Sequence, residues 1–201
     1  MSKFLKINLL IKYLLILIIL ISVSSCDQSE KAEKKFGSGK VIVKVFSSLT
    51  CPHCANFHLK VIVELKKKYN NSSQVKFKHV SFPLDLAALN AEKIMYCFNN
   101  NEKRFDFLTE IYKNQKSWAV GSDIILINDS IKKIGKKLGL ESTKMNKCLE
   151  DDKIQEKILN ERISAQKKYK ISSTPTIYIN KKKYTGKHEF NAFEKEMVKE
   201  F

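Results

Sequence analysis

Two cysteines separated by two residues, Cys51 and Cys54, have the most distinctive reactivity in this sequence. Pro52 follows the first of them, and proline suits the first turn of a helix because it has no N–H to leave unpaired. A thiolate at that position is stabilised by free backbone N–H groups and by the helix dipole, so its pKa falls below the ordinary ~8.5. His53 adds a donor or a positive charge. We therefore predict a redox disulfide between Cys51 and Cys54 that readily accepts electrons.

Two other interpretations of these cysteines stay open. A metal site would use Cys51, Cys54 and His58, with His79 or His188 as a remote fourth ligand. Structural zinc prefers four ligands, and the sequence has no second Cys-x-x-Cys pair. A static structural disulfide is the third interpretation. The position at a helix start favours the redox interpretation over both.

The elements that must position the cysteines are visible in the hydrophobic pattern. The β-branched run 41–46 predicts a buried strand, and apolar residues at helical spacing from 57 to 69 predict a helix after Pro52. Residues 74–82 predict a second strand, and 85–168 are helical with breaks near 99–101, Gly121 and Gly139. A strand at 176–180, a hairpin partner at 183–186 and a helix over 190–201 complete an α/β order.

The composition argues against a nucleic-acid reader. The chain has 201 residues and a formal net charge of +16, but only two of its 37 basic residues are arginines, Arg104 and Arg162. Arginine is the usual reader of phosphates and guanine edges. The lysines are spread through the whole sequence, so we predict no nucleic-acid partner.

The amino terminus resembles an export signal. Lys3, Lys6 and Lys12 precede an apolar run of secretory length, so residues 1–25 are predicted to be a signal peptide. Val23-Ser24-Ser25-Cys26 resembles a lipoprotein box, which predicts lipidation of Cys26 and a membrane anchor at the N-terminus. Ordinary cleavage after Ser25 and an uncleaved anchor are the alternatives. All three predict export to an oxidising compartment such as the periplasm, with 26–39 as a tether.

A second short motif, Ser173-Thr174-Pro175-Thr176 before the late strand, completes a resemblance. Together with the Cys-Pro-His-Cys quartet it is similar to the thioredoxin superfamily and, within it, to DsbA-type thiol:disulfide oxidoreductases. The resemblance implies a thioredoxin fold with an inserted helical domain: residues 40–84 and 169–201 form the thioredoxin part, and 85–168 the insertion. It also implies a cis peptide bond before Pro175 and substrate binding by the Thr174–Pro175 loop.

The implied function is donation of a disulfide from Cys51–Cys54 to exported proteins by dithiol–disulfide exchange, without a cofactor or metal. The implied partners are reduced or unfolded exported proteins and a quinone-linked membrane reoxidant of DsbB or VKOR type. Thr174 stands where DsbC- and DsbG-type isomerases have threonine, so an exported isomerase or reductase on the same fold is an alternative. A metal carrier is a less favoured alternative.

Two cysteines remain, Cys97 and Cys148. In an oxidising compartment they are predicted to form a structural disulfide that joins two helices of the insertion. Two buried thiols, or a redox relay with Cys51 and Cys54, are the other interpretations.

Overall fold

The computed structural model describes residues 41–69 and 74–201. The signal peptide predicted over 1–25, the tether predicted over 26–39 and the lipidation site at Cys26 lie outside these residues. Within the described ranges, no helix combines the length and the apolar character needed to cross a bilayer.

The four strands form one mixed sheet in the order β2-β1-β3-β4. β1 (Val41–Ser47) and β2 (Val75–Ser81) are parallel, whereas β1 and β3 (Thr176–Ile179) are antiparallel, as are β3 and β4 (Lys182–Tyr184). The register places Ser47 beside Ser81 at the carboxyl ends of the two parallel strands. The chain therefore leaves β1 and β2 at the same edge of the sheet.

The helix predicted after Pro52 is present but is not uniform. It consists of α3 (Pro52–Phe57), the π-helical segment η2 (His58–Ile62) and α4 (Val63–Lys68). The wider turn of a π-helix changes which side chains face inward. Here it buries His58. From the sequence alone, this histidine could lie at the surface as readily as in the core.

Six helices lie between β2 and β3 in the chain. They are α5 (Leu86–Tyr96), α6 (Asn101–Lys113), α7 (Gln115–Trp118), α8 (Ile124–Lys137), α9 (Ser142–Glu150) and α10 (Asp152–Tyr169). Asp123 caps α8 by accepting hydrogen bonds from two backbone N–H groups, and Gly139 has a φ of +89° after that helix. Both features agree with the breaks predicted from the sequence.

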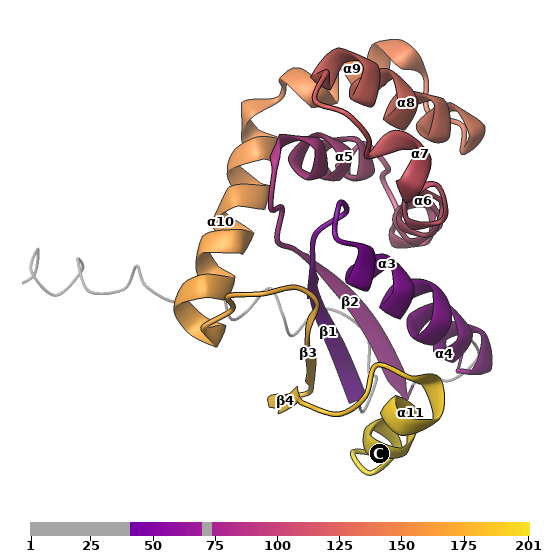
Figure 1. Ribbon diagram of the computed structural model, residues 1–201, viewed down its shortest axis with the longest axis vertical. Helices are drawn as coiled ribbons and strands as arrows, with labels where there is room; N and C mark the ends of the chain where they lie inside the picture. Colours follow the sequence, from indigo (N-terminus) through magenta and orange to yellow (C-terminus); the bar gives the residue numbers. More distant parts are fainter. Residues whose placement is uncertain (1–40, 70–73) are drawn as a thin grey trace, which may run out of the picture. The chain divides into compact units, whose positions relative to one another are not determined.

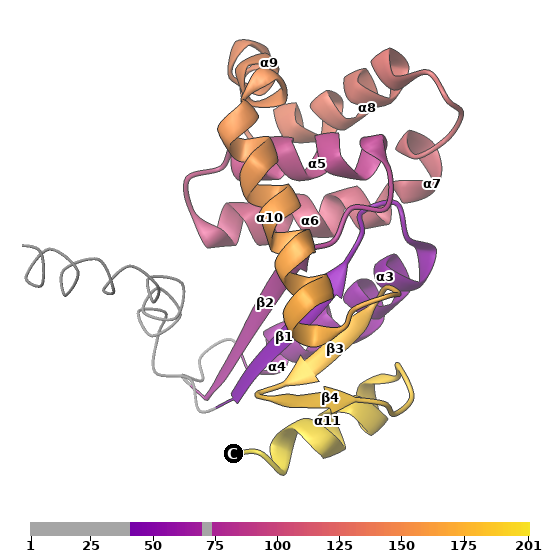
Figure 2. The same cartoon turned by 90° about the vertical axis from the view of Figure 1, so that its left-hand side faces the viewer.

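The helices cover the sheet from two sides. Figures 1 and 2 show α10 along one face of the sheet, and α3, α4 and the C-terminal helix α11 (Phe190–Val198) along the other. α11 packs Phe193 and Met197, both fully buried, into the core that Phe57 shares. α5 to α9 lie beyond the carboxyl end of β1 and form a second core. Cys51 and Cys54 join that second core, so they lie where the sheet meets the helical block.

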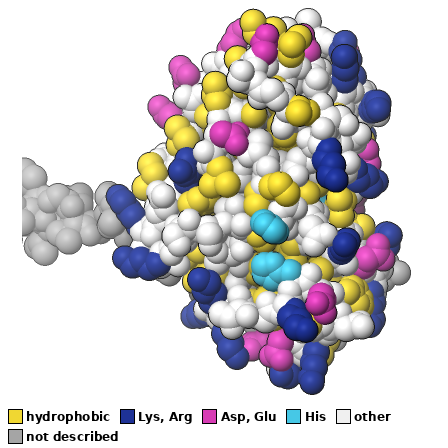
Figure 3. All heavy atoms as spheres, in the orientation of Figure 1, with side chains coloured by type: hydrophobic (Ala, Val, Ile, Leu, Met, Phe, Trp, Pro, Cys, Tyr) yellow, Lys and Arg dark blue, Asp and Glu magenta, His cyan; other side chains and the backbone are white. Residues whose placement is uncertain are grey.

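Charged side chains are spread over the face shown in Figure 3, with basic and acidic groups interspersed around its edge. Two histidine side chains lie next to each other near the centre, bordered by apolar side chains. The basic side chains visible on this face do not gather into a stripe.

Candidate active site

Cys51 is the N-cap residue of α3, and Pro52 occupies the first turn. The Cys51 sulfur accepts a hydrogen bond from the backbone N–H of Cys54 at 3.3 Å. The strand-to-helix junction predicted from the sequence therefore places the first sulfur where unpaired N–H groups of the helix converge. The two sulfurs are not bonded to each other in this structure.

The two thiols differ strongly in acidity. A hydrogen bond from the Cys54 thiol outweighs burial and lowers the pKa of Cys51 to about 5, with smaller contributions from Thr174 and from backbone N–H groups of Cys54 and His53. Burial raises the pKa of Cys54 far above its ordinary value. Cys51 is therefore a thiolate at neutral pH, and Cys54 is a thiol. This asymmetry is typical of a nucleophile and its resolving partner.

The Thr174–Pro175 loop closes the site opposite α3. The peptide bond between these two residues is cis. The Cys51 thiol lies 3.5 Å from the carbonyl oxygen of Thr174, 123 residues away in the chain. The Thr174 hydroxyl is buried and finds no hydrogen-bond partner among the described residues, but it contributes to lowering the pKa of both thiols.

A residue that sequence reasoning missed, Gln115, holds the cysteine loop from the helical block. Its side-chain amide donates to the carbonyl oxygen of Leu49 at 2.7 Å and to that of Cys51 at 3.1 Å. Both bonds are buried, so they connect α7 firmly to the loop before α3. A glutamine in a lysine-rich helical stretch gave no signal for this role.

His53 is exposed, and its contribution to the acidity of Cys51 comes from its backbone N–H. His58 is buried and hydrogen-bonds Thr109 at 2.9 Å, while burial lowers its pKa to about 3. Within the described ranges, no three His, Cys, Asp or Glu side chains are grouped as metal ligands would be. The structure thus brings together Cys51, Cys54, Thr174 and Pro175, but it does not add His58 to the two sulfurs as a ligand set.

The family model described as thioredoxin matches residues 37–199, which is most of the chain. The chain belongs to the thioredoxin family. A solved structure, α-DsbA1 from Wolbachia pipientis, is 28% identical with a TM-score of 0.73, covering 80% of this chain and 85% of that one. This similarity confirms the predicted thioredoxin fold with a DsbA-type helical insertion, although the exact domain boundaries stay a prediction.

Relatives of this thioredoxin-family protein have names that refer to thiol–disulfide chemistry. One from Rickettsia bellii, provisionally named a protein-disulfide oxidoreductase, is 29% identical over 141 residues, which cover 70% of this chain and 53% of the relative. One from Bacillus cereus, named a probable disulfide bond formation protein D, is 29% identical over 159 residues, covering 74% of this chain and 70% of the relative. The chain spans about half the length of the first of these relatives.

The remaining two cysteines lie in the helical block of this thioredoxin-family protein. Cys97, at the end of α5, is bonded to Cys148 on α9, with an S–S distance of 2.04 Å and 6.1 Å between Cα atoms. The structure therefore contains the pairing that the sequence favoured. This disulfide joins two helices and lies apart from the Cys51–Cys54 motif in the chain.

Removing the Cys97–Cys148 disulfide is expected to destabilise the protein without slowing thiol exchange. The bond closes a loop with a sequence separation of 51 residues. The loop-entropy model gives roughly 4 kcal/mol for a loop of this length. Denaturant unfolding of a Cys97→Ala/Cys148→Ala variant measures the loss of stability. A loss of turnover at unchanged stability would show instead that this pair takes part in a redox relay.

Proposed function

We propose that this protein is a thiol:disulfide oxidoreductase that donates the Cys51–Cys54 disulfide to exported proteins. The observation that carries the proposal is the asymmetric cysteine pair at the start of α3, with Cys51 against the Thr174–Pro175 loop. A thiolate that is stable in the reduced protein makes the disulfide a better acceptor of electrons. The family membership and the names of the relatives support the same chemistry.

The exchange proceeds in two displacements. A substrate thiolate attacks the Cys51 sulfur, the Cys51–Cys54 bond breaks, and its electron pair stays on the Cys54 sulfur. The substrate's second thiolate then attacks its own sulfur in the mixed disulfide and releases Cys51 as a thiolate. The substrate is oxidised by two electrons, and the Cys51–Cys54 pair is reduced by the same two. An extended substrate segment would pair with the backbone of the Thr174–Pro175 loop.

The test mixes the oxidised protein with one equivalent of a reduced peptide that has two cysteines. We expect one peptide disulfide to form for each pair of thiols that appears on the protein. A peptide that stays reduced while both protein thiols stay absent would contradict the proposed function.

The proposed location is outside the cytoplasm, in the periplasm, with the protein anchored through a lipid on Cys26. The basic and apolar N-terminal sequence and the lipoprotein-like box support this proposal. A membrane reoxidant of the DsbB or VKOR type would then act on an enzyme held at the same surface. Incorporation of labelled palmitate in cells should be lost in a Cys26→Ser variant; equal labelling of both proteins would refute lipidation at this residue.

Thr174 favours disulfide isomerisation as a second candidate. Its hydroxyl is buried beside both sulfurs and lacks a partner among the described residues, so it is available to a substrate or to a mixed disulfide. An isomerase would restore activity to a substrate protein with scrambled disulfides when supplied in its reduced form. An oxidase would not reactivate the scrambled substrate. It would instead form disulfides in the same substrate when that substrate is fully reduced.

A further inference from the structure

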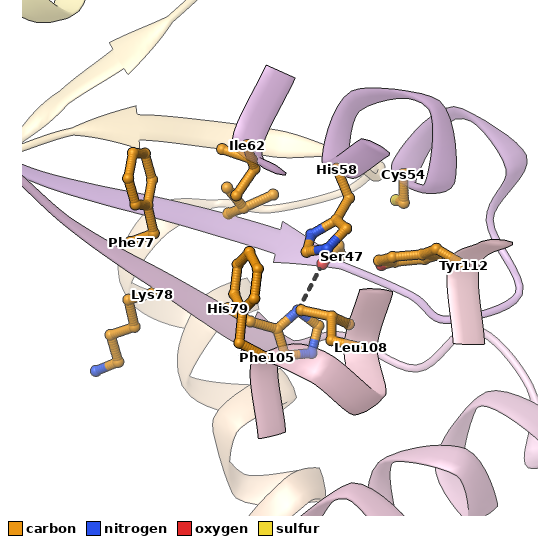
Figure 4. Close-up of a pocket in the computed structure, with 11 residues that line it drawn as sticks. Ser47, Cys54, His58, Ile62, Phe77, Lys78, His79, Phe105, Leu108 and Tyr112 are labelled. Atoms are coloured by element: carbon orange, nitrogen blue, oxygen red, sulfur yellow. Dashed lines mark hydrogen bonds between the residues drawn. The ribbon is translucent and has the colours of Figure 1, made fainter. Parts of the chain in front are cut away.

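A small, partly open cavity lies beside the buried cysteine. Its volume is about 30 Å³, and the polar residues that line it are Cys54, Ser47, His58, Lys78, His79 and Tyr112. Figure 4 shows the Cys54 side chain and the rings of His58 and Tyr112 around the Ser47 hydroxyl. A cavity of this size has room for one or two water molecules. Cys54 is only 2% exposed and lines this cavity.

A chain of short hydrogen bonds leads away from the cavity. The Ser47 hydroxyl lies 2.9 Å from His79 Nδ1, as the dashed line in Figure 4 marks, and His79 Nε2 lies 2.7 Å from a carboxylate oxygen of Glu92. The other oxygen of Glu92 accepts a hydrogen bond from Ser81 at 2.9 Å. Ser47 ends β1, His79 is on β2 and Glu92 is on α5, so packing of the helical block on the sheet assembles the chain.

Burial of Glu92 and His79 affects which charges these two side chains carry. Glu92 is fully buried, and a buried carboxylate needs a counter-charge. Burial alone would disfavour a charged His79, but the charge and hydrogen bond of Glu92 outweigh it and raise the pKa of His79, with a smaller contribution from Glu161 on α10. The contact with Glu92 therefore favours the protonated form of His79.

Two other titratable groups that line the cavity, His58 and Tyr112, stay in one state near neutral pH. His58 on η2 is neutral because burial lowers its pKa to about 3. Tyr112 on α6 keeps its proton because burial raises its pKa well above the ordinary value. The Lys78 side chain, on β2, extends away from the cavity in Figure 4. Among the described residues that line the cavity, this leaves His79 to exchange a proton with Cys54.

We propose that His79, held in its protonated form by Glu92, exchanges a proton with the Cys54 sulfur through Ser47 and water in the cavity. Glu92 is then a positioning residue that acts through His79. The proposal rests on the proposed function, because it supplies the proton that this exchange requires at a buried sulfur.

Protons and electrons balance in both directions. When a substrate thiolate displaces Cys54 from Cys51, the electron pair of the broken S–S bond stays on Cys54. His79 Nδ1 gives its proton to the Ser47 oxygen, the Ser47 proton passes to water, and a water proton passes to Cys54. During reoxidation, the Cys51 thiolate first attacks an acceptor disulfide, which forms a mixed disulfide on Cys51 and releases the acceptor's first sulfur as a thiolate. Cys54 returns its proton by the same path. Cys54 then attacks Cys51 in the mixed disulfide, and the acceptor's second sulfur leaves with the electron pair.

Two variants and one matched control test the proposal in the full chain. Glu92→Gln keeps the size of the side chain and removes the charge that holds the His79 proton. Ser47→Ala keeps the His79–Glu92 pair and breaks its connection to the cavity. The control, Glu194→Gln, removes a carboxylate that accepts a hydrogen bond from Tyr69 and lies outside the cavity lining.

The measurement follows reoxidation of the reduced protein by glutathione disulfide from pH 5 to 9, which separates attack by Cys51 from the later attack by Cys54. We expect the Cys54 step to slow by roughly 100-fold in Glu92→Gln and Ser47→Ala, at the lower end of proton-transfer contributions. The pH dependence that His79 gives this step should be lost in Glu92→Gln. Alkylation of Cys51 and the rates of Glu194→Gln should stay within about twofold of wild type.

Wild-type rates of the Cys54 step in a folded Ser47→Ala variant would overturn the proposal, whether or not Glu92→Gln folds. Equal slowing of the Cys51 and Cys54 steps in Ser47→Ala would also overturn it, because the effect would then not be specific to the buried sulfur. Absence of any thiol exchange in the wild-type protein would instead refute the proposed function.

Discussion

Replacing Cys51 with serine is expected to reduce disulfide transfer to a dithiol peptide by at least ~1,000-fold, because the attacked sulfur is removed. Replacing Cys54 with serine should have a different result. Cys51 can still form a mixed disulfide with a substrate, but the resolving sulfur is absent. We therefore expect covalent adducts with substrate proteins that are released by a reductant.

The two variants control for each other, since each removes one sulfur from the same helix turn. Non-reducing electrophoresis of both proteins, purified from cells, distinguishes the roles. We expect mixed disulfides with substrate proteins on the Cys54→Ser variant and none on the Cys51→Ser variant. Adducts that form through Cys54 when Cys51 is absent would reverse the assignment of nucleophile and resolving partner.

Cys51 is expected to titrate near pH 5, well below an ordinary thiol with its pKa of ~8.5. The rate of alkylation by iodoacetamide should therefore reach half of its plateau near pH 5. A Thr174→Val variant loses one of the groups that stabilise the thiolate, so its half-plateau should shift to higher pH. A wild-type midpoint near 8.5 would show that the helix start does not activate this sulfur.

The same low pKa makes the stability of the reduced protein depend on pH. Because the pKa of Cys51 is lower in the folded than in the unfolded chain, the unfolded chain binds more protons between about pH 5 and 8. Stability from the Cys51 thiolate is thus present above the ordinary thiol pKa and is lost as the pH falls toward 5. Relative to the oxidised protein, the reduced protein should become less stable between pH 8 and pH 5; no change in this difference would contradict the assigned acidity.

The sequence predicted the parts of the site that depend on local pattern. The β-branched run before Cys51 and the proline after it predicted a strand that leads into a helix start. The late Thr174–Pro175 motif predicted the loop that the structure brings to Cys51. Both signals are local, because strand propensity, helix starts and proline geometry act over a few residues.

The Glu92–His79–Ser47 chain could not be predicted in the same way. Hydrophobic spacing shows which face of a helix is apolar, but it does not show that Glu92 and Lys93 are both buried. The partner of His79 could not be predicted from the sequence, because Glu92 is on a different element, α5, and contacts His79 only when the helical block packs on the sheet. Hydrophobic spacing also does not predict the π-helical turn that buries His58. These contacts depend on tertiary packing, which outweighs local pattern.

The reduction potential of the Cys51–Cys54 pair, equilibrated against glutathione, tests the central claim most directly. A protein that donates disulfides should have a value near that of DsbA, about −120 mV. The lowered pKa of Cys51 stabilises the reduced state and moves the potential in this direction. A value near that of thioredoxin, about −270 mV, would contradict the account and indicate a reductase on the same fold.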